Sequence, residues 1–305
     1  MQTYFSNGKL LLTGEYIVLD GAKALALPTK LGQSLIVEPL EGPKVIWKSL
    51  DENGKIWFEE VFLMEQIAAS SDSDRFHQND VSKRLIQILQ AAQRLNPNFL
   101  TGPLGYRITT KLSFPKDWGL GTSSTLINNI AQWAKVDAYH LLKLTFGGSG
   151  YDIACAQYNT AITYQLKNGK PSVDEVDFNP TFKDHLYFVY LNKKQNSREG
   201  ITHYKNAQPV SKDILQNISA LSEAIVSCNT LNAFQDLMQQ HEAIISKVTQ
   251  QTPVKDRLFN DFKGSIKSLG AWGGDFVLAA SKDNPRPYFE NKGYTTVLDY
   301  TVSML

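Results

Sequence analysis

The sequence has little cysteine, and Cys155 and Cys228 are the only two among its 305 residues. They form no Cys-x-x-Cys pair, which excludes zinc ribbons and thioredoxin-type redox sites. Two cysteines in a chain of this length are typical of a reducing compartment. The length is ample for a hydrophobic core that needs neither disulfides nor a structural metal. We therefore expect a cytoplasmic protein.

Long hydrophobic runs and an excess of one charge are also lacking. No apolar run reaches the roughly 18 residues that a membrane span needs, and the polar segment 1–7 contains no signal-peptide core. Lys and Arg number 31 against 30 Asp and Glu, so the formal net charge is +1. Broad nucleic-acid binding requires a strong basic excess. We therefore expect no membrane and no nucleic-acid partner, while a local basic cleft for an anionic small molecule stays open.

Turn residues divide the chain into short strands and amphipathic helices. Hairpins are expected around Asp51–Gly54 and Asn168-Gly169, which separate strand-like runs. The first 40 residues indicate strands broken by glycines, with Gly14 to Tyr16 inside an apolar strand region, and Ser70 to Asp74 indicate a polar loop. Helices are expected to begin at Asn79 or Asp80, to follow Thr125, and to cover roughly 211–227, 230–249 and 254–269.

Strands and helices are mixed in both halves of the chain, which is typical of an α+β fold. At roughly 100–200 residues per domain, the length suggests two domains. A break near Asn179-Pro180, followed by a strongly apolar strand pattern at Leu186–Leu191, predicts domains over 1–179 and 180–305.

The segment Gly119-Leu120-Gly121-Thr122-Ser123-Ser124-Thr125 has the residue types of an anion-binding loop. Glycines let the backbone approach a phosphate, the free N–H groups of a helix start point at it, and hydroxyls can bind phosphate oxygens or Mg²⁺. It is not a Walker A loop, because no Gly-Lys-Ser/Thr follows, and it lacks the third glycine of a dinucleotide fingerprint. Taken alone, a turn with a Ser or Thr N-cap explains the segment equally well.

Three other segments carry candidate chemistry. In Gly147–Asp152, three glycines precede a carboxylate that could accept a hydroxyl proton or could instead cap a helix. Gly270–Asp275 is a glycine cluster that suits a tight connector or a wall beside a phosphate. Lys9 enters an apolar strand, where a lysine is usually an edge residue with its ammonium in water.

Together these segments resemble the GHMP kinases, the family of galactokinase, homoserine kinase, mevalonate kinase and phosphomevalonate kinase. The three ordered motifs of that family are similar to Gly8–Tyr16, Pro115–Thr125 and Lys267–Asp275 of this chain. Gly148–Asp152 is similar to the catalytic-aspartate motif of the mevalonate and phosphomevalonate kinase branch. The order and spacing hold from residue 8 to residue 280.

The resemblance implies a GHMP kinase fold, with an N-terminal domain like the second domain of ribosomal protein S5 and a ferredoxin-like C-terminal domain. It implies that ATP and Mg²⁺ bind in the cleft between them. Asp152 would act on the substrate hydroxyl, with Lys9 beside it. The implied ATP-binding residues are Gly119, Leu120, Gly121, Thr122, Ser123 and Ser124, and Ser124 would also be the Mg²⁺ ligand. The implied substrate-binding residues are Ser149, Ser197, Arg198, Lys267 and Gly270.

The chain departs from the family pattern at several positions. The phosphate loop ends Thr122-Ser-Ser-Thr125 instead of Ser-Ser-Ala-Ala. Trp272 stands where the third motif usually has glycine, and we expect its indole to reshape the nucleotide or substrate wall. Leu141 replaces the Mg²⁺-binding Glu of mevalonate kinases, and Tyr16 replaces their usual His. The last two departures favour the phosphomevalonate kinase branch.

The implied function is an ATP-dependent small-molecule kinase that transfers the γ-phosphoryl group to a small acid such as phosphomevalonate or mevalonate, in the mevalonate pathway of isoprenoid biosynthesis. Two alternatives stay open, namely a non-catalytic nucleotide-binding or regulatory homologue, and a kinase for an acceptor outside that pathway. A homodimer is compatible with each of them. Lys193, Lys194 and Arg198 could hold a phosphate or carboxylate, although a solvated loop explains them equally well. The histidines show no metal-binding spacing and are interpreted as structural: His77, His140, His185, His203 and His241.

Overall fold

The computed structural model describes residues 1–68, 79–206 and 209–305. The polar loop predicted at Ser70–Asp74 and His77 lie outside the described residues. The chain divides into two compact units that alternate along the sequence. Unit 1 comprises 1–8, 31–116 and 121–157, and unit 2 comprises 9–30, 117–120 and 158–305. This division by contacts differs from the predicted domains 1–179 and 180–305, which stay a prediction.

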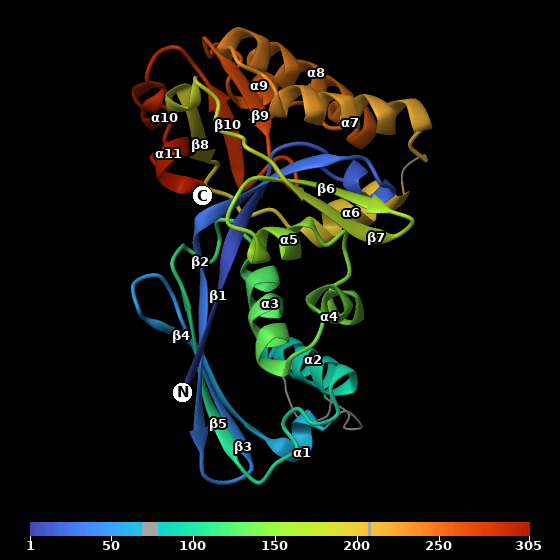
Figure 1. Ribbon diagram of the computed structural model, residues 1–305. Helices are drawn as coiled ribbons and strands as arrows, with labels where there is room; N and C mark the ends of the chain where they lie inside the picture. The colour runs from blue at the N-terminus through green and yellow to red at the C-terminus, as the bar shows by residue number, and fades with distance from the viewer. Residues whose placement is uncertain (69–78, 207–208) are drawn as a thin grey trace. The chain divides into compact units, whose positions relative to one another are not determined.

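Unit 1 is a sheet with helices on one face (Figure 1). Its strands are β3 (Lys44–Leu50), β4 (Ile56–Leu63), β5 (Gly105–Leu112), and the parts of β1 (Gln2–Leu11) and β2 (Ala24–Leu40) within the unit. Strand β3 pairs antiparallel with β4 and parallel with β5, and β5 pairs antiparallel with residues 33–40 of β2. The helices are α1 (Met64–Ile67), α2 (Asp80–Leu95), α3 (Thr122–Ala134), α4 (Ala138–Thr145) and α5 (Tyr151–Gln157).

The core of unit 1 lies between this sheet and its helices. Burial alternates along β3, so that Val45 and Trp47 face inward, as the two-residue period of a strand requires. Helix α2 adds Leu89 and α3 adds Ile127 to the same cluster. Asn79 caps α2 by accepting the amide hydrogen of Val81 at 2.8 Å. The cap predicted at Asn79 or Asp80 is thus confirmed.

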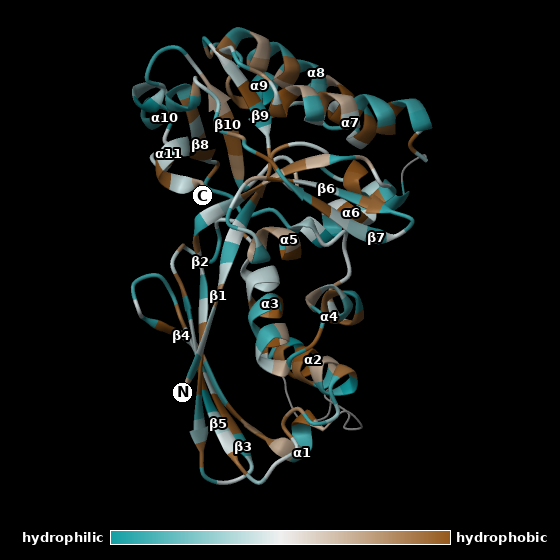
Figure 2. Ribbon diagram, viewed as in Figure 1, coloured by the Kyte–Doolittle hydropathy of each residue, from teal (hydrophilic) through white to brown (hydrophobic). Residues whose placement is uncertain are grey.

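Unit 2 contains an antiparallel sheet in the strand order β11-β8-β10-β9. Its strands are β8 (Leu186–Tyr190), β9 (Ser265–Ser268), β10 (Phe276–Ala280) and β11 (Val297–Asp299). Unit 2 also contains β6 (Ile162–Lys167), which pairs antiparallel with β7 (Lys170–Glu175) and with residues 24–26 of β2. Its helical segments are η1 (Ile17–Asp20), η3 (Lys183–His185), α6 (Ser197–Asn206), α7 (Lys212–Val226), α8 (Leu231–Thr249), α9 (Val254–Leu258), α10 (Arg286–Asn291) and α11 (Tyr300–Ser303). Strand β10 is hydrophobic and wholly buried (Figure 2).

Most of the predicted elements are confirmed. Both hairpins form, as β3–β4 and β6–β7, and α7 and α8 begin behind the N-caps Ser211 and Thr230. The α+β class is also confirmed. No helix in the described parts of the chain combines the length and apolar character needed to cross a bilayer.

Two local predictions are wrong. The helix expected over 254–269 ends at Leu258, and Ser265–Ser268 form strand β9, because their backbone pairs with β10 and all four side chains are buried there. The strand expected through Gly14 to Tyr16 stops at Leu11. Tyr16 has φ 61°, which lies outside the β region, and the chain turns there into η1.

Candidate active site

In unit 2, Lys9 holds the glycine-rich loop by two hydrogen bonds. Its backbone N–H donates to the Leu120 carbonyl at 3.0 Å, and its ammonium donates to the Gly119 carbonyl at 2.8 Å. The second bond joins residues 110 positions apart in the sequence. Lys9 is half-buried, so its charge stays close to the backbone of this loop.

Asp275 brings the third glycine-rich segment to the same point. Gly119 has φ +69°, and a Cβ there would overlap the Asp275 carboxylate, so the two segments pack as closely as a glycine allows. The amide of Gln195 donates to Asp275 Oδ1 at 3.0 Å, and the Asp275 amide donates to the Lys193 carbonyl at 2.7 Å. Asp275 therefore links the glycine-rich loop to the basic segment that begins at Lys193.

The charge of Asp275 is balanced by its surroundings. Burial raises the pKa of its carboxyl group, and the Gln195 amide and the positive charges of Lys9 and Lys194 oppose that rise. Lys194 also lies 3.7 Å from the Asp117 carboxylate. Unit 2 thus gathers cations and carboxylates around the backbone of Gly119.

In unit 1, helix α3 begins with exposed hydrogen-bonding capacity. Gly121 precedes it at φ 95°, and no side chain caps the helix. Thr122 is half-buried and Ser123 is exposed, whereas Ser124 is buried with its hydroxyl donating to the Gly121 carbonyl at 3.0 Å. The Thr125 hydroxyl donates to Gln33 Oε1 at 2.7 Å. The uncapped first-turn amides and the exposed Ser123 hydroxyl are therefore suited to an anion, while the Thr125 hydroxyl is engaged with Gln33.

Asp152 lies half-buried in the first turn of α5, also in unit 1. The amide of Ile153 donates to Asp152 Oδ1 at 3.1 Å. Helix α5 packs beside α3, where Gln157 Nε2 donates to Asn128 Oδ1 at 2.9 Å (Figure 1). Ser149 is half-buried in the loop that leads to α5. The predicted pairing of Lys9 with Asp152 joins the two units and stays a prediction.

The donors at the start of α3 fit the phosphates of a nucleoside triphosphate with Mg²⁺. Uncapped amides at a helix start suit phosphate oxygens, and the Ser124 oxygen, whose proton points to Gly121, keeps lone pairs for a cation. In the described ranges no group of three or more His, Cys, Asp or Glu could hold a metal ion. A Mg²⁺ here would therefore take most of its ligands from phosphates and water.

The remaining predicted site residues lie in different environments. Ser197 and Arg198 are exposed at the start of α6, and Gly270 adopts φ +59° after β9. Lys267 differs from the prediction, because it is wholly buried instead of facing a substrate. Its ammonium donates to the Glu15 carboxylate and to the Ser268 carbonyl, the latter at 2.9 Å.

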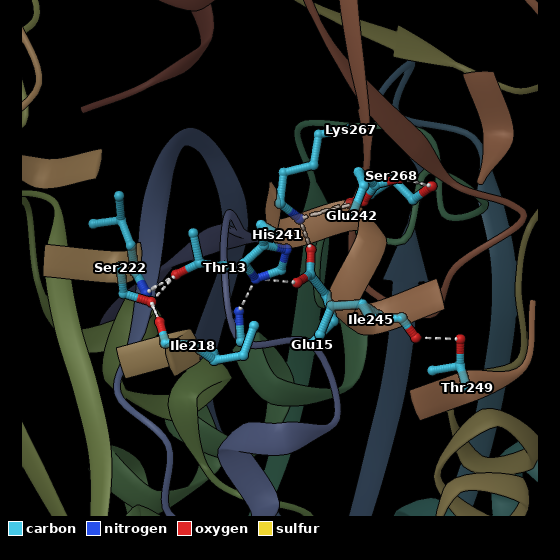
Figure 3. A network of polar contacts seen from close by, with 12 residues as sticks. Thr13, Glu15, Ile218, Ser222, His241, Glu242, Ile245, Thr249, Lys267 and Ser268 are labelled. Atoms are coloured by element: carbon cyan, nitrogen blue, oxygen red, sulfur yellow. Dashed lines mark hydrogen bonds and ion pairs between the residues drawn. The ribbon is translucent and has the colours of Figure 1, made fainter. Parts of the chain in front are cut away.

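Lys267 belongs to a buried polar network that the sequence did not indicate (Figure 3). Its ammonium lies 3.9 Å from Glu242 Oε1, and Ser268 Oγ donates to Glu242 Oε2 at 3.0 Å. On the other side, His241 Nε2 lies 3.4 Å from Glu15 Oε2. The network therefore joins the first motif, α8 and the third motif within unit 2.

Burial controls protonation in this network. It raises the pKa of Glu15, against the opposing charge of Lys267, and it raises the pKa of Glu242 to about 7. Burial and Lys267 hold the pKa of His241 well below its usual range. The Gly14 amide donates to His241 Nε2 at 2.9 Å, which assigns the ring proton to Nδ1 and agrees with a neutral ring. His241 is thus structural, as expected.

Three solved structures can be compared with this geometry. The mevalonate kinase of Methanococcus jannaschii is similar with a TM-score of 0.71 at 18% identity, over 97% of this chain and 96% of that chain. The phosphomevalonate kinase of Streptococcus pneumoniae, solved with phosphomevalonate and AMPPNP, has a TM-score of 0.68 at 15% identity, over 96% and 95%. The galactokinase of Lactococcus lactis, solved with galactose, has a TM-score of 0.69 at 15% identity, over 100% and 93%.

The chain has the two-domain GHMP kinase fold. At the level of sequence, no family model and no curated protein matches it. Within the GHMP kinase fold, the contacts of Lys9 and Asp275 bring the first and third motifs to the glycine-rich loop.

Sequence reasoning missed two features of this site. Asp275 was only the last residue of a glycine cluster, although a carboxylate directly after two glycines is well placed for close backbone approach. Glu15 had a clearer signal, because an ionisable residue within an apolar run requires a buried partner. Nothing in the sequence indicated that His241 and Glu242 would lie beside it.

The Glu242→Gln variant should gain stability relative to wild type as pH rises. An unfolded Glu ionises near its ordinary pKa of 4.5, whereas the folded group retains its proton to about 7, so folding takes up a proton between these values. Ionisation of Glu242 thus lowers stability across that range, by up to about 3 kcal/mol. Thermal unfolding of the wild type and the variant from pH 4.5 to 8.5 measures the difference in stability. The neighbouring groups Glu15, His241 and Lys267 are present in both proteins. A difference that stays constant with pH would contradict the assignment.

The Lys267→Met variant should lose about 3–5 kcal/mol of unfolding free energy, because it leaves Glu15 buried without its cation. Lys48→Met is the matched control, since the Lys48–Glu59 pair at 3.2 Å is exposed and should be worth at most about 1 kcal/mol. Denaturant titration measures both. Adding Glu15→Gln to Lys267→Met should recover part of the loss, because the buried carboxylate is then removed as well. Equal losses in Lys267→Met and Lys48→Met would refute the buried pair.

Proposed function

We propose that the chain is an ATP-dependent kinase that phosphorylates a small acid. The observation that carries this proposal is the contact set around Gly119, where Lys9 of the first motif and Asp275 of the third motif reach the glycine-rich loop. The three solved proteins of this fold described above are kinases, which supports the same reaction class. With two cysteines, a cytoplasmic location is part of the proposal.

The residues suit the demands of phosphoryl transfer. Such reactions pass through a loose transition state, so catalysis depends on positioning and on neutralising charge. Bound Mg-ATP would supply the phosphoryl group and its bridging cation. Lys9 would supply positive charge at the loop, the α3 amides and Ser124 would hold phosphate and cation, and Asp152 would orient the acceptor hydroxyl and take its proton late.

For the acceptor, we propose a phosphorylated acid such as phosphomevalonate in preference to its unphosphorylated parent. Lys193, Lys194 and Arg198 are exposed within six residues, and the Asp275 contacts fix the first part of this segment. Charge-assisted hydrogen bonds to a phosphate are roughly twice as strong as neutral ones, so a dianion gains most from such a segment. The Streptococcus pneumoniae protein named above was solved with phosphomevalonate, which agrees with this acceptor class.

The Asp152→Asn variant should keep its fold and its nucleotide affinity but lose turnover by about 10²–10⁴-fold, the usual effect of a positioned acid–base group. Asp80→Asn is the matched control, because Asp80 also lies in the first turn of a helix. ATP turnover with phosphomevalonate, mevalonate and homoserine measures both variants. Nucleotide binding without turnover on any acceptor would favour a non-catalytic homologue, and near wild-type turnover of Asp152→Asn would remove it from catalysis.

The Arg198→Ala variant should raise the acceptor KM by about 10-fold or more, since a hydrogen bond to a charged group contributes about 1.5–3 kcal/mol. The KM for ATP should not change. Lys205→Ala removes a cation from the exposed far end of the same helix and serves as the control. Steady-state kinetics with competing acceptors gives these values, and a preference for an unphosphorylated acceptor would overturn the acceptor assignment.

A further inference from the structure

Helix α6, which begins with Ser197 and Arg198, lies against the first motif through aromatic side chains of unit 2. The ring of Tyr204 stacks on that of Tyr16, with centroids 5.6 Å apart and planes inclined by 21°. The Tyr204 hydroxyl donates a hydrogen bond to the Asp20 carboxylate, just beyond the first motif. Burial and Asp20 raise the pKa of Tyr204, so its hydroxyl keeps the donated proton.

The backbone of α6 also packs tightly against Tyr16. A Cβ on Gly200 would overlap the Tyr16 hydroxyl, so only glycine permits this approach without a shift. Tyr204 is the one fully buried side chain of α6, and Ile201 is partly buried beside the same cluster. Few side chains of α6 are buried, so the effect of each buried side chain on the helix can be measured.

Trp272 completes this arrangement from the third motif. Its side chain is 1% exposed and belongs to the same hydrophobic cluster as Tyr16 and Tyr204. The indole thus lies in the core of unit 2, where it supports the first motif, and this differs from the expected effect on a nucleotide or substrate wall. Its N–H has no hydrogen-bond partner within the residues that the structure describes.

Backbone strain occurs at both ends of this cluster. Tyr16 has φ 61° and Trp272 has φ 41°, in the left-handed region that aromatic residues rarely adopt. Such conformations persist only where the surrounding structure over-determines them, and they gather at functional sites. Tyr16, Tyr204 and Trp272 belong to one hydrophobic cluster, and its packing supports both conformations.

We propose that Tyr16, Tyr204 and Trp272 form an aromatic clamp whose function is to position α6, and with it Ser197 and Arg198, for the acceptor. The proposal rests on the kinase function proposed above. The three residues are positioning residues that act on acceptor affinity through α6. Nucleotide affinity depends on other contacts, those of the glycine-rich loop, and should not follow the clamp.

The first test is Tyr204→Phe, which keeps the stacked ring and removes the hydrogen bond to Asp20. Amide hydrogen exchange of residues 197–206 should become about 10-fold faster, and the acceptor KM should rise by a similar factor at an unchanged ATP KM. Tyr288→Phe is the matched control, because the Tyr288 hydroxyl also donates a hydrogen bond to a carboxylate, that of Asp261, at 2.6 Å. Tyr288 packs against a different hydrophobic cluster from that of Tyr204. It should change neither quantity.

The second test is Trp272→Phe, compared with Trp47→Phe in unit 1, since both tryptophans are 1% exposed. Both variants should lose stability, but only Trp272→Phe should speed exchange in 197–206. A third variant, Gly200→Ala, should also raise the acceptor KM, and adding Tyr16→Phe should reverse part of this rise by removing the overlapping hydroxyl.

The outcomes separate this proposal from the kinase assignment. Unchanged exchange of α6 in both Tyr204→Phe and Trp272→Phe overturns the clamp, whatever the activity. Faster exchange with an unchanged acceptor KM also overturns it, because α6 would then have no part in acceptor binding. A wild-type protein that phosphorylates no acceptor refutes the proposed function and the acceptor role together, while exchange still decides whether the clamp holds α6.

Discussion

A buried ion pair fixes how the first and third motifs meet in unit 2. The Lys267 ammonium is wholly buried, and taking such a group out of water costs several kcal/mol unless opposite charge and hydrogen bonds compensate. Glu15 and the Ser268 carbonyl provide that compensation. Because the pair joins residues 252 positions apart, it forms only when β9 and the first motif have come together in one register.

The chain segments on either side of this ion pair also meet at the glycine-rich loop. Upstream of Glu15, Lys9 lies within β1, and its ammonium donates a hydrogen bond to the Gly119 carbonyl of the glycine-rich loop. Downstream of Lys267, the chain passes through Trp272 and returns at Asp275 to the same glycine. The first and third motifs therefore meet twice within unit 2, once in the buried network and once at the loop, and each meeting limits how far the other can shift.

Charge and aromatic packing have separate roles in this arrangement. The members of the buried network contact one another and are buried, so the network joins the motifs without exposing a reactive group. Helix α6 is the opposite case, since it exposes Ser197 and Arg198 and has a single fully buried residue, Tyr204. Elements with few buried contacts belong to the least stable part of a fold, where segments that bind ligands are commonly found.

Features that depend on neighbouring residues could be predicted from the sequence alone. The sequence determined α2 with its cap, α7 and α8, both hairpins, the α+β class and the glycine-rich start of α3, because periodicity, capping and turn chemistry act within a few residues. Only the tertiary structure decided that residues 265–268 form a strand, that Lys267 is buried against Glu15, and that Trp272 faces the core. These outcomes depend on strand pairing and on packing between segments far apart in the chain. The free energy of burying an ionisable side chain depends on the partner that such a segment provides.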